Sequence, residues 1–176
     1  MMAHVLHRYE EKLMGLPYPV ILLDAAEEIT HPKTDKVLGV AVPDAEELAA
    51  AVAFALCFMP TRLSGAEVRF IRRVMGMTGQ ELAAAVGMGP ATLSRWEHGK
   101  QTVGGWADKA VRMAAVLRLR DRVPGSRLRP EDIVSLQFAP RDADSHPTIE
   151  VRRVQPAGSD AEPELKSWDA EILLAA

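Results

Sequence analysis

The sequence predicts an α+β protein: a small N-terminal antiparallel sheet plus a helix, then an all-α domain and a C-terminal extension. Three observations lead to this class. Short apolar runs bounded by proline and acidic residues fill much of the first 42 residues, as is typical of strands. Capping-box pairs then recur three times between residues 44 and 81, before apolar residues at helical spacing. The charge also changes sign twice along the chain.

The charge pattern divides the 176 residues into three parts. Residues 1–60 carry 4 Lys or Arg and 9 Asp or Glu, a net charge of −5. Residues 61–129 carry 13 and 5, a net charge of +8, and residues 130–176 carry 4 and 10, a net charge of −6. A basic middle between two acidic arms fits a central nucleic-acid surface. We expect domains at 1–60 and 61–122 and an extension, partly ordered or mobile, at 123–176.

Composition excludes several classes of protein. The single cysteine, Cys57, excludes an intramolecular disulfide and any structural zinc site that needs two thiolates. Its apolar surroundings predict a buried small hydrophobe. The longest apolar run, residues 48–59, is shorter than the roughly 20 residues of a transmembrane helix. The N-terminus has no signal-peptide pattern, and we therefore expect a cytoplasmic protein without a membrane partner.

The N-terminal part is predicted to form a short sheet. Residues 1–17 are a mixed arm with Tyr9 as its anchor. Residues 19–23 form a strand that ends at a turn, a second strand follows up to Thr30, and residues 36–42 form another.

A strongly apolar helix is predicted after this sheet. Asp44 and Glu47 have capping-box spacing, and the helix runs to about Phe58. Its apolar stripe consists of Leu48, Val52 and Leu56. Because further apolar residues surround the stripe, this helix must pack on the sheet, the next domain or a partner.

Two more capping boxes open helices in the basic middle. Ser64 and Glu67 begin a helix whose inward face is Val68, Ile71 and Val74 or Met75. Thr78 and Glu81 begin a second, shorter helix at Gly79, and Gly87 ends it.

A third short helix follows at once. Gly89 is its N-cap, Pro90 takes the first helical position, and Gly99 ends it. Leu93 and Trp96 point inward. Two short helices joined by a glycine-containing turn are the helix-turn-helix signature.

A longer helix is predicted from about Gly105 to Arg120. One of its faces carries Trp106, Ala110, Met113 or Ala114, and Leu117. Trp106, like Trp96, is predicted to lie in the core. A second apolar set closes the domain core or forms a dimer seam: Val103, Val111 and Val116.

The last fifty residues give weaker patterns. Residues 130–136 predict a short helix, 148–154 a strand, and 166–174 an apolar-containing tail.

The helix-turn-helix region resembles the XRE (Cro/C1-type) family. The matching residues are Leu82, Ala83, Gly87, Leu93, the run Ser94-Arg95-Trp96-Glu97, Gly99 and Lys100. The resemblance covers about a third of the chain. It implies a lambda-repressor-like domain that binds double-stranded DNA, and in this family Glu97 has a structural role.

A narrower resemblance is to MqsA-type antitoxins of type II toxin–antitoxin systems. It rests on the phrase Leu63-Ser-Gly-Ala-Glu-Val-Arg-Phe-Ile-Arg-Arg73, on Ser-Arg-Trp-Glu and on the acidic domain in front. Relatives with an N-terminal zinc domain carry paired cysteines, which this chain lacks. It looks more like zinc-free relatives, in which Gly-Leu-Pro (here residues 15–17) leads into a short sheet.

The outward residues of the third short helix are the candidates for base contact in the major groove. Arg95 can grip guanine O6 and N7, or alternatively bind phosphate or remain solvated. Ser94 can donate or accept, while Ala91 and the Thr92 methyl can contact a thymine methyl. Thr92 can instead be used within the helix N-terminus. Pro90 shapes the approach.

The start of the second short helix is a candidate phosphate site, formed by Thr78 and Gln80. Family members usually have glutamine directly after the cap; here that position is Gly79. Lys100 and Gln101 are further phosphate candidates, with a solvated lysine as the alternative. Such contacts position a protein without reading sequence.

These features predict a sequence-specific transcriptional regulator. One motif unit reads a half-site, so we expect a homodimer on a near-palindromic operator, most simply a repressor. The antitoxin resemblance implies repression of its own operon, with a toxin bound by residues 1–60 or by the acidic tail. The alternatives are a stand-alone ligand-responsive repressor and a protein-interaction module without a DNA-binding role.

No catalytic chemistry is expected. The sequence has no glycine-rich phosphate loop or nucleophile elbow, and its five histidines lack partners at metal-site spacing. We therefore predict no enzymatic activity, no cofactor and no metal.

Overall fold

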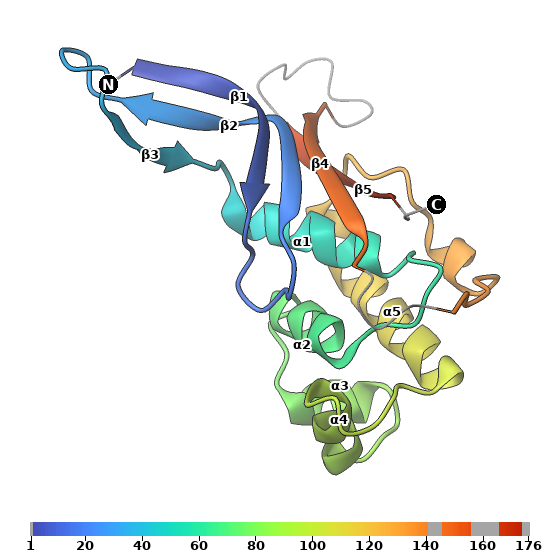
Figure 1. Ribbon diagram of the computed structural model, residues 1–176. Helices are drawn as coiled ribbons and strands as arrows, with labels where there is room; N and C mark the ends of the chain where they lie inside the picture. Colours follow the sequence, from blue (N-terminus) through green and yellow to red (C-terminus); the bar gives the residue numbers. More distant parts are fainter. Residues whose placement is uncertain (1, 141–145, 156–165, 174–176) are drawn as a thin grey trace.

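A sheet brings together strands from both ends of the chain (Figure 1). The computed structural model describes residues 2–140, 146–155 and 166–173. Within them the sheet has five strands: β1 (Met2–Glu11), β2 (Val20–Thr30), β3 (Val37–Ala41), β4 (Thr148–Val154) and β5 (Ser167–Leu173). The order is β1-β2-β4-β5, and β3 also pairs with β2. The predicted α+β class and the N-terminal antiparallel sheet are confirmed.

The N-terminal strands are longer than predicted. The prediction of a mixed arm at residues 1–17 is wrong, since β1 pairs with β2 along most of its length. The predicted turn after Leu23 is a bulge inside one continuous strand. Asp24 adopts a left-handed conformation there, with φ of 50°, and its carboxylate contacts His7 of β1. A bulge inserts one extra residue into a strand without ending its pairing. The residues of this bulge resemble a turn, and the prediction therefore divided one strand into two.

Two segments of the C-terminal extension complete this sheet. The strand at 148–154 is confirmed as β4, which runs parallel to β2 with Ile21 opposite Glu150. The tail predicted at 166–174 forms β5 up to Leu173, and residue 174 lies outside the described residues. In place of the short helix predicted at 130–136 there is a 3-10 turn that covers only Pro130–Ile133.

Helix α1 (Ala45–Leu56) lies between the sheet and the remaining helices (Figure 1). Eight of its 12 residues are buried. The predicted capping box at its start is wrong, because the Asp44 side chain makes no cap hydrogen bond and the residue has φ of 47°. The Asp44 carboxylate instead pairs with Arg153 at 2.5 Å, and its carbonyl accepts a hydrogen bond from the indole of Trp168. Strands β4 and β5 therefore hold the start of α1.

The other four helices follow the predicted pattern. They are α2 (Gly65–Val74), α3 (Gly79–Ala85), α4 (Pro90–Glu97) and α5 (Gly105–Leu119), with a 3-10 turn at Arg120–Arg122. The capping boxes at Ser64 and Thr78 are both confirmed. Gly87 and Gly99 take the left-handed conformations expected of helix ends, with φ of 69° and 66°. No helix among the described residues combines the length and apolar character needed to cross a membrane.

A buried ion pair on α5 holds the connection between α1 and α2. Asp108 and Arg112 are both fully buried and pair with each other. The Arg112 guanidinium also donates to carbonyls of the α1–α2 connection: Leu56, Cys57, Met59 and Thr61. Asp108 accepts the backbone N–H of Leu63 at 2.7 Å. This carbonyl cradle fixes the connection against α5.

A second contact joins the β1–β2 connection to α2. The hydroxyl of Tyr18 donates to Glu67, and both side chains are buried. Glu67 also accepts the backbone N–H of Ser64 at 2.7 Å, as the capping box requires. The same carboxylate therefore caps α2 and anchors the sheet part on it.

The orientation of α5 contradicts the prediction that Trp106 lies in the core. The second apolar set closes the core rather than forming a dimer seam, because all three of its members are buried: Val103, Val111 and Val116. Trp106 is not in the core, since 75% of its surface is exposed, and Leu117 is 56% exposed. The buried charges of Asp108 and Arg112 turn the opposite face of the helix inward. The predicted stripe shares one face, as expected. Trp106 and Leu117 on that face point outward, whereas Ala110 and Met113 are half-buried and pack against the core.

Burial predicts an inert thiol at Cys57. Its side chain is fully buried, its Sγ–H donates to the carbonyl of Ala53, and burial raises its pKa to about 12. The thiolate fraction at pH 8 is therefore negligible. We expect no reaction of the folded chain with Ellman's reagent at pH 8, and one thiol per chain in guanidinium chloride. Complete reaction within minutes under native conditions would contradict this burial.

Candidate nucleic-acid interface

Helix α3 begins with a fully formed capping box. The Thr78 hydroxyl accepts the backbone N–H of Glu81 at 3.2 Å, and the Glu81 carboxylate accepts that of Thr78 at 2.7 Å. The hydrogen bond from the Thr78 backbone, and after it that from the Thr78 side chain, lowers the pKa of the Glu81 carboxyl. The hydroxyl of Thr78 is thus already engaged, whereas the side chain of Gln80 is exposed.

Helix α4 has one buried and one exposed face. Leu93 and Trp96 are only 1% and 4% exposed, so both predicted inward positions are confirmed. The residues left on the outside are Pro90, Ala91, Ser94 and Arg95, while Thr92 is half-buried. Arg95 donates to the Thr92 hydroxyl at 3.3 Å, which favours one orientation of the guanidinium across the exposed face. The predicted base-contact residues therefore share one accessible surface.

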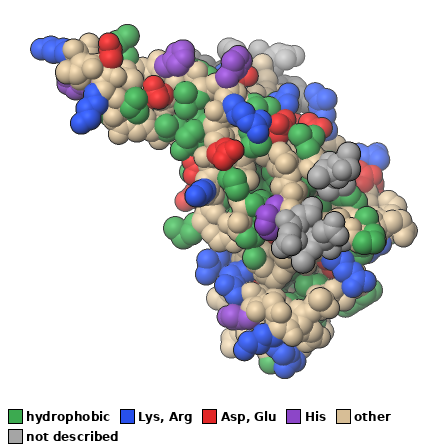
Figure 2. All heavy atoms as spheres, in the orientation of Figure 1, with side chains coloured by type: hydrophobic (Ala, Val, Ile, Leu, Met, Phe, Trp, Pro, Cys, Tyr) green, Lys and Arg blue, Asp and Glu red, His purple; other side chains and the backbone are tan. Residues whose placement is uncertain are grey.

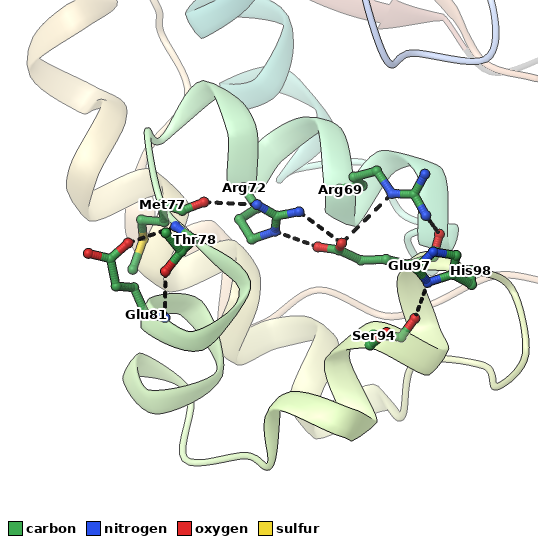
Figure 3. Close-up of polar contacts among 8 residues, drawn as sticks. All are labelled: Arg69, Arg72, Met77, Thr78, Glu81, Ser94, Glu97 and His98. Atoms are coloured by element: carbon green, nitrogen blue, oxygen red, sulfur yellow. Dashed lines mark hydrogen bonds and ion pairs between the residues drawn. The ribbon is translucent and has the colours of Figure 1, made fainter.

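An ion-pair network fixes α4 on α2 (Figure 3). Arg72 donates to both carboxylate oxygens of Glu97, at 2.6 and 2.9 Å, and to the carbonyl of Met77 at 2.9 Å. Arg69 donates to the Glu97 carbonyl at 2.6 Å. The side-chain hydrogen bond to Glu97 raises the pKa of Arg72. A bidentate arginine–carboxylate pair sets both distance and orientation.

Close backbone packing adds a second constraint on α4. Gly65, the first residue of α2, lies against the end of α4: a Cβ at this position would stand 1.9 Å from the Trp96 carbonyl oxygen. Only glycine allows the two helices to approach this closely. Sequence reasoning placed Glu97 in a structural role, which is confirmed, but it missed Gly65, Arg69 and Arg72. Their partners lie about 30 residues away, and no local pattern reports such contacts.

Two further predicted residues follow α4 directly. Lys100 and Gln101 are exposed, and the backbone N–H of Lys100 donates to the carbonyl of Arg95 at 2.8 Å. Gly99 is left-handed, and this hydrogen bond ends the helix. Lys100 and Gln101 therefore follow α4 directly. Figure 2 shows Lys and Arg side chains gathered at the end of the molecule formed by α3 and α4. All nine predicted DNA-contact residues thus lie on or beside these two helices.

The described residues show no group of three or more potential metal ligands. The exposed face of α4 and the start of α3 offer backbone N–H groups, hydrogen-bonding side chains and positive charge. These are the components by which a helix-turn-helix engages a duplex.

Comparison with known proteins identifies the same region. Residues 68–105, from α2 to the start of α5, match a family model described as helix-turn-helix. This match spans 38 of the 176 residues. No curated protein and no solved structure gives a significant match. The geometry and the family match agree, and the chain carries an XRE-type helix-turn-helix of the kind found in DNA-binding regulators.

Proposed function

We propose that this protein is a sequence-specific repressor that binds a near-palindromic operator as a two-fold dimer. The observation that carries the proposal is the division of α4. Its inner face is buried and tied to α2 through Glu97, whereas its outer face is free to enter a major groove. A helix that is held rigidly and exposes polar side chains on its outer face is suited to contact base edges.

Arg95 is the principal specificity residue in this proposal. It lies on the exposed face of α4, and its contact with Thr92 pre-orients the planar guanidinium. Bidentate hydrogen bonds to O6 and N7 make guanine its preferred base. Ser94 and Ala91 lie on the same face and contact neighbouring base pairs, and Pro90 sets the approach of the helix.

Phosphate contacts flank this helix on two sides. Lys100 and Gln101 follow its C-terminal end, and Gln80 with the Thr78 backbone lies at the start of α3. Because the Thr78 hydroxyl is used in the capping box, the Gln80 side chain is the better hydrogen-bond donor to phosphate there. These contacts set affinity and register and make binding depend on salt.

Replacement of Arg95 by alanine tests the base contact. We expect a loss of about 1–3 kcal/mol in operator binding and relaxed specificity at one base pair. Arg152→Ala, which removes the same charge from an exposed position on β4, is the matched control and should leave operator binding nearly unchanged. Fluorescence anisotropy with single-base operator variants measures both effects. A loss that is uniform across all sequences would instead make Arg95 a phosphate contact.

The primary experiment is a mobility shift with the promoter DNA upstream of the protein's own gene, against random duplex, at several salt concentrations. Preferential binding to the promoter that weakens as salt rises supports the proposal. Equal binding to both duplexes reduces it to non-specific affinity. No binding to either at low salt favours the protein-interaction module.

An antitoxin role extends the proposal. The net charges of −5 in residues 1–60 and −6 in residues 130–176 suit a basic toxin partner. Co-purification of a neighbouring gene product that binds the sheet part, and that alters promoter binding, would support this role.

One structural feature favours a ligand-responsive repressor as the second candidate. A cavity of about 480 Å³ lies between α1 and β5. Its lining is mainly apolar, and its polar residues are Arg127, Asp169 and Glu171. A small amphipathic molecule bound here, next to Pro60 of the α1–α2 connection, would sit beside the joint with the helix-turn-helix.

A further inference from the structure

Strand β5 leaves one of its edges open. Among the described residues it pairs with β4 alone, and it lies at the end of the strand order, next to α1 (Figure 1). Every second residue of an edge strand turns its backbone N–H and C=O groups away from the sheet. These outward groups can pair with a further strand.

The cavity of about 480 Å³ between α1 and β5 runs along this edge. Four consecutive residues of β5, 169–172, line it. Because neighbouring residues of a strand point to opposite faces, a cavity that touches all four follows the edge of the strand rather than one face. At about 3.3 Å per residue these four residues span roughly 13 Å. The cavity therefore offers room for a short added strand.

The face of β5 that packs on α1 is apolar. Trp168, whose indole donates to a carbonyl at the start of α1, shares this face with Ala170 and Ile172. The apolar lining of the cavity also includes Phe58 and Leu128, which are only half-buried. Apolar side chains of an added strand that point toward α1 would therefore be covered.

The opposite face of β5 is acidic. Asp169 and Glu171 alternate with the apolar residues and also line the cavity. Burial raises the pKa of the Asp169 carboxyl above its ordinary value, although the nearby Arg127 acts against this shift. The neighbouring cations therefore do not offset the desolvation of this carboxylate. A further positive charge beside it is favourable.

Charge decides between a second copy of β5 and another kind of strand. Pairing of two β5 edges would bring the Asp169 and Glu171 side chains of both copies together, and like charges on neighbouring strands are destabilising. Lysine or arginine on that face of an added strand instead forms stabilising cross-strand pairs. The net charge of −6 over residues 130–176 favours a basic partner in the same way.

We propose that the edge of β5 binds an extended segment of a partner protein in which apolar residues alternate with lysine or arginine. The apolar side chains pack on Phe58, Leu128 and Ile172, and the basic ones lie beside Asp169 and Glu171. Backbone hydrogen bonds to the strand edge supply affinity, and the alternating side chains supply specificity. This binding does not use the exposed face of α4, and it shares with the antitoxin role only the expectation of a basic partner.

The first test uses synthetic peptides and the full chain. The probe is fluorescein-labelled Val-Lys-Ile-Lys-Val-Lys-Ile, and anisotropy measures its binding. One control peptide has the same composition with the lysines contiguous, and another has glutamate in place of every lysine. We expect only the alternating basic peptide to bind. Equal binding of the contiguous-lysine peptide would reduce the effect to general charge attraction and overturn the proposal. Binding of none of them would leave the cavity to a small molecule and overturn it too.

Backbone methylation of the probe tests strand addition itself. One peptide is N-methylated at its lysines and another at its apolar residues, so each loses one of the two sets of outward N–H groups. Only one set can face β5. We therefore expect one of the two peptides to bind at least about 10-fold more weakly than the parent and the other to bind nearly as well. Equal loss in both, or loss in neither, would exclude strand addition.

Substitutions in the chain locate the site. Glu171→Lys is compared with Glu10→Lys, because Glu10 is also exposed and lies on β1, the outer strand at the other end of the sheet. Thermal melts establish that both variants are folded. We expect Glu171→Lys to weaken binding of the alternating peptide at least about 10-fold and Glu10→Lys to leave it nearly unchanged. Loss in Glu10→Lys without loss in Glu171→Lys would place the peptide on β1 and overturn the proposal.

Two milder variants should act in opposite directions. Asp169→Asn removes a carboxylate beside the added strand and should weaken binding about 3-fold, whereas Arg127→Gln removes a competing cation and should strengthen it by a similar factor. A general loss of structure would weaken binding in both. Weaker binding in both variants would therefore contradict the assigned charges.

These readouts are separate from the proposed function. The peptide assay contains no DNA, so its failure leaves the repressor untouched. Promoter binding by Glu171→Lys should equal that of the wild type. Binding of the alternating peptide by a chain that ignores its promoter would keep the β5 site and reject the repressor.

Discussion

Replacement of Arg112 by methionine is expected to lower the free energy of unfolding by about 3–5 kcal/mol. Methionine replaces the unbranched stem of the arginine side chain and removes the guanidinium. Asp108 is then left as an unpaired, fully buried charge. The carbonyls of the α1–α2 connection, among them those of Met59 and Thr61 at 2.6 Å, lose their donor as well. Each buried acceptor without a partner adds to the cost.

Urea denaturation followed by circular dichroism measures this loss. Arg129→Met is the matched control, because the ion pairs of Arg129 with other described residues are exposed and its replacement should change stability by less than about 1 kcal/mol. Arg112→Lys should fall between the two, since lysine restores the charge but not the planar fork that reaches several carbonyls. A change below about 1 kcal/mol for Arg112→Met would show that the cradle does not hold the connection between α1 and α2.

Substitution of Gly65 by alanine is expected to displace α4 and to abolish tight operator binding. The added Cβ would meet the Trp96 carbonyl oxygen at 1.9 Å, and backbone rather than a flexible side chain must move. Overpacking of this kind costs about 1–3 kcal/mol or more. The Arg72–Glu97 pair spans the same interface, so its geometry is disturbed too. A shift of about 1 Å in a reading helix is enough to misalign its hydrogen bonds with base edges.

Gly39→Ala provides the control, because a Cβ at that position on β3 meets no atom within 4 Å. Stability and operator affinity are measured together for both variants. The expected pattern is a loss of both for Gly65→Ala and of neither for Gly39→Ala. Normal operator affinity in Gly65→Ala would show that the approach of α2 and α4 does not set the position of the reading helix.

Local signals predicted the helix-turn-helix well. The boxes at Ser64 and Thr78, and the stops at Gly87 and Gly99, depend on atoms within a few residues of each other. Such interactions join atoms that are already close along the chain, and for this reason sequence alone can report them. The outward face of α4 followed from the same periodicity.

Features that depend on distant partners were not predictable in the same way. Asp44 has the spacing of a cap, but it is used by Arg153 and Trp168, more than 100 residues away. Trp106 is apolar, yet the Asp108–Arg112 pair takes the inward face of α5. The Arg72–Glu97 pair likewise joins residues that no periodic pattern connects. Parallel pairing of β2 with β4 is the most distant of these contacts, and sequence patterns do not specify such partners.

The pairing of β2 with β4 has a consequence for the order in which this protein forms during translation. Ile21 has left the ribosome long before its partner Glu150 is synthesised. At about 5–20 residues per second the interval is roughly 6–26 seconds. Helix formation takes far less time than this interval. The helix-turn-helix can therefore form while one edge of β2 still lacks its neighbour.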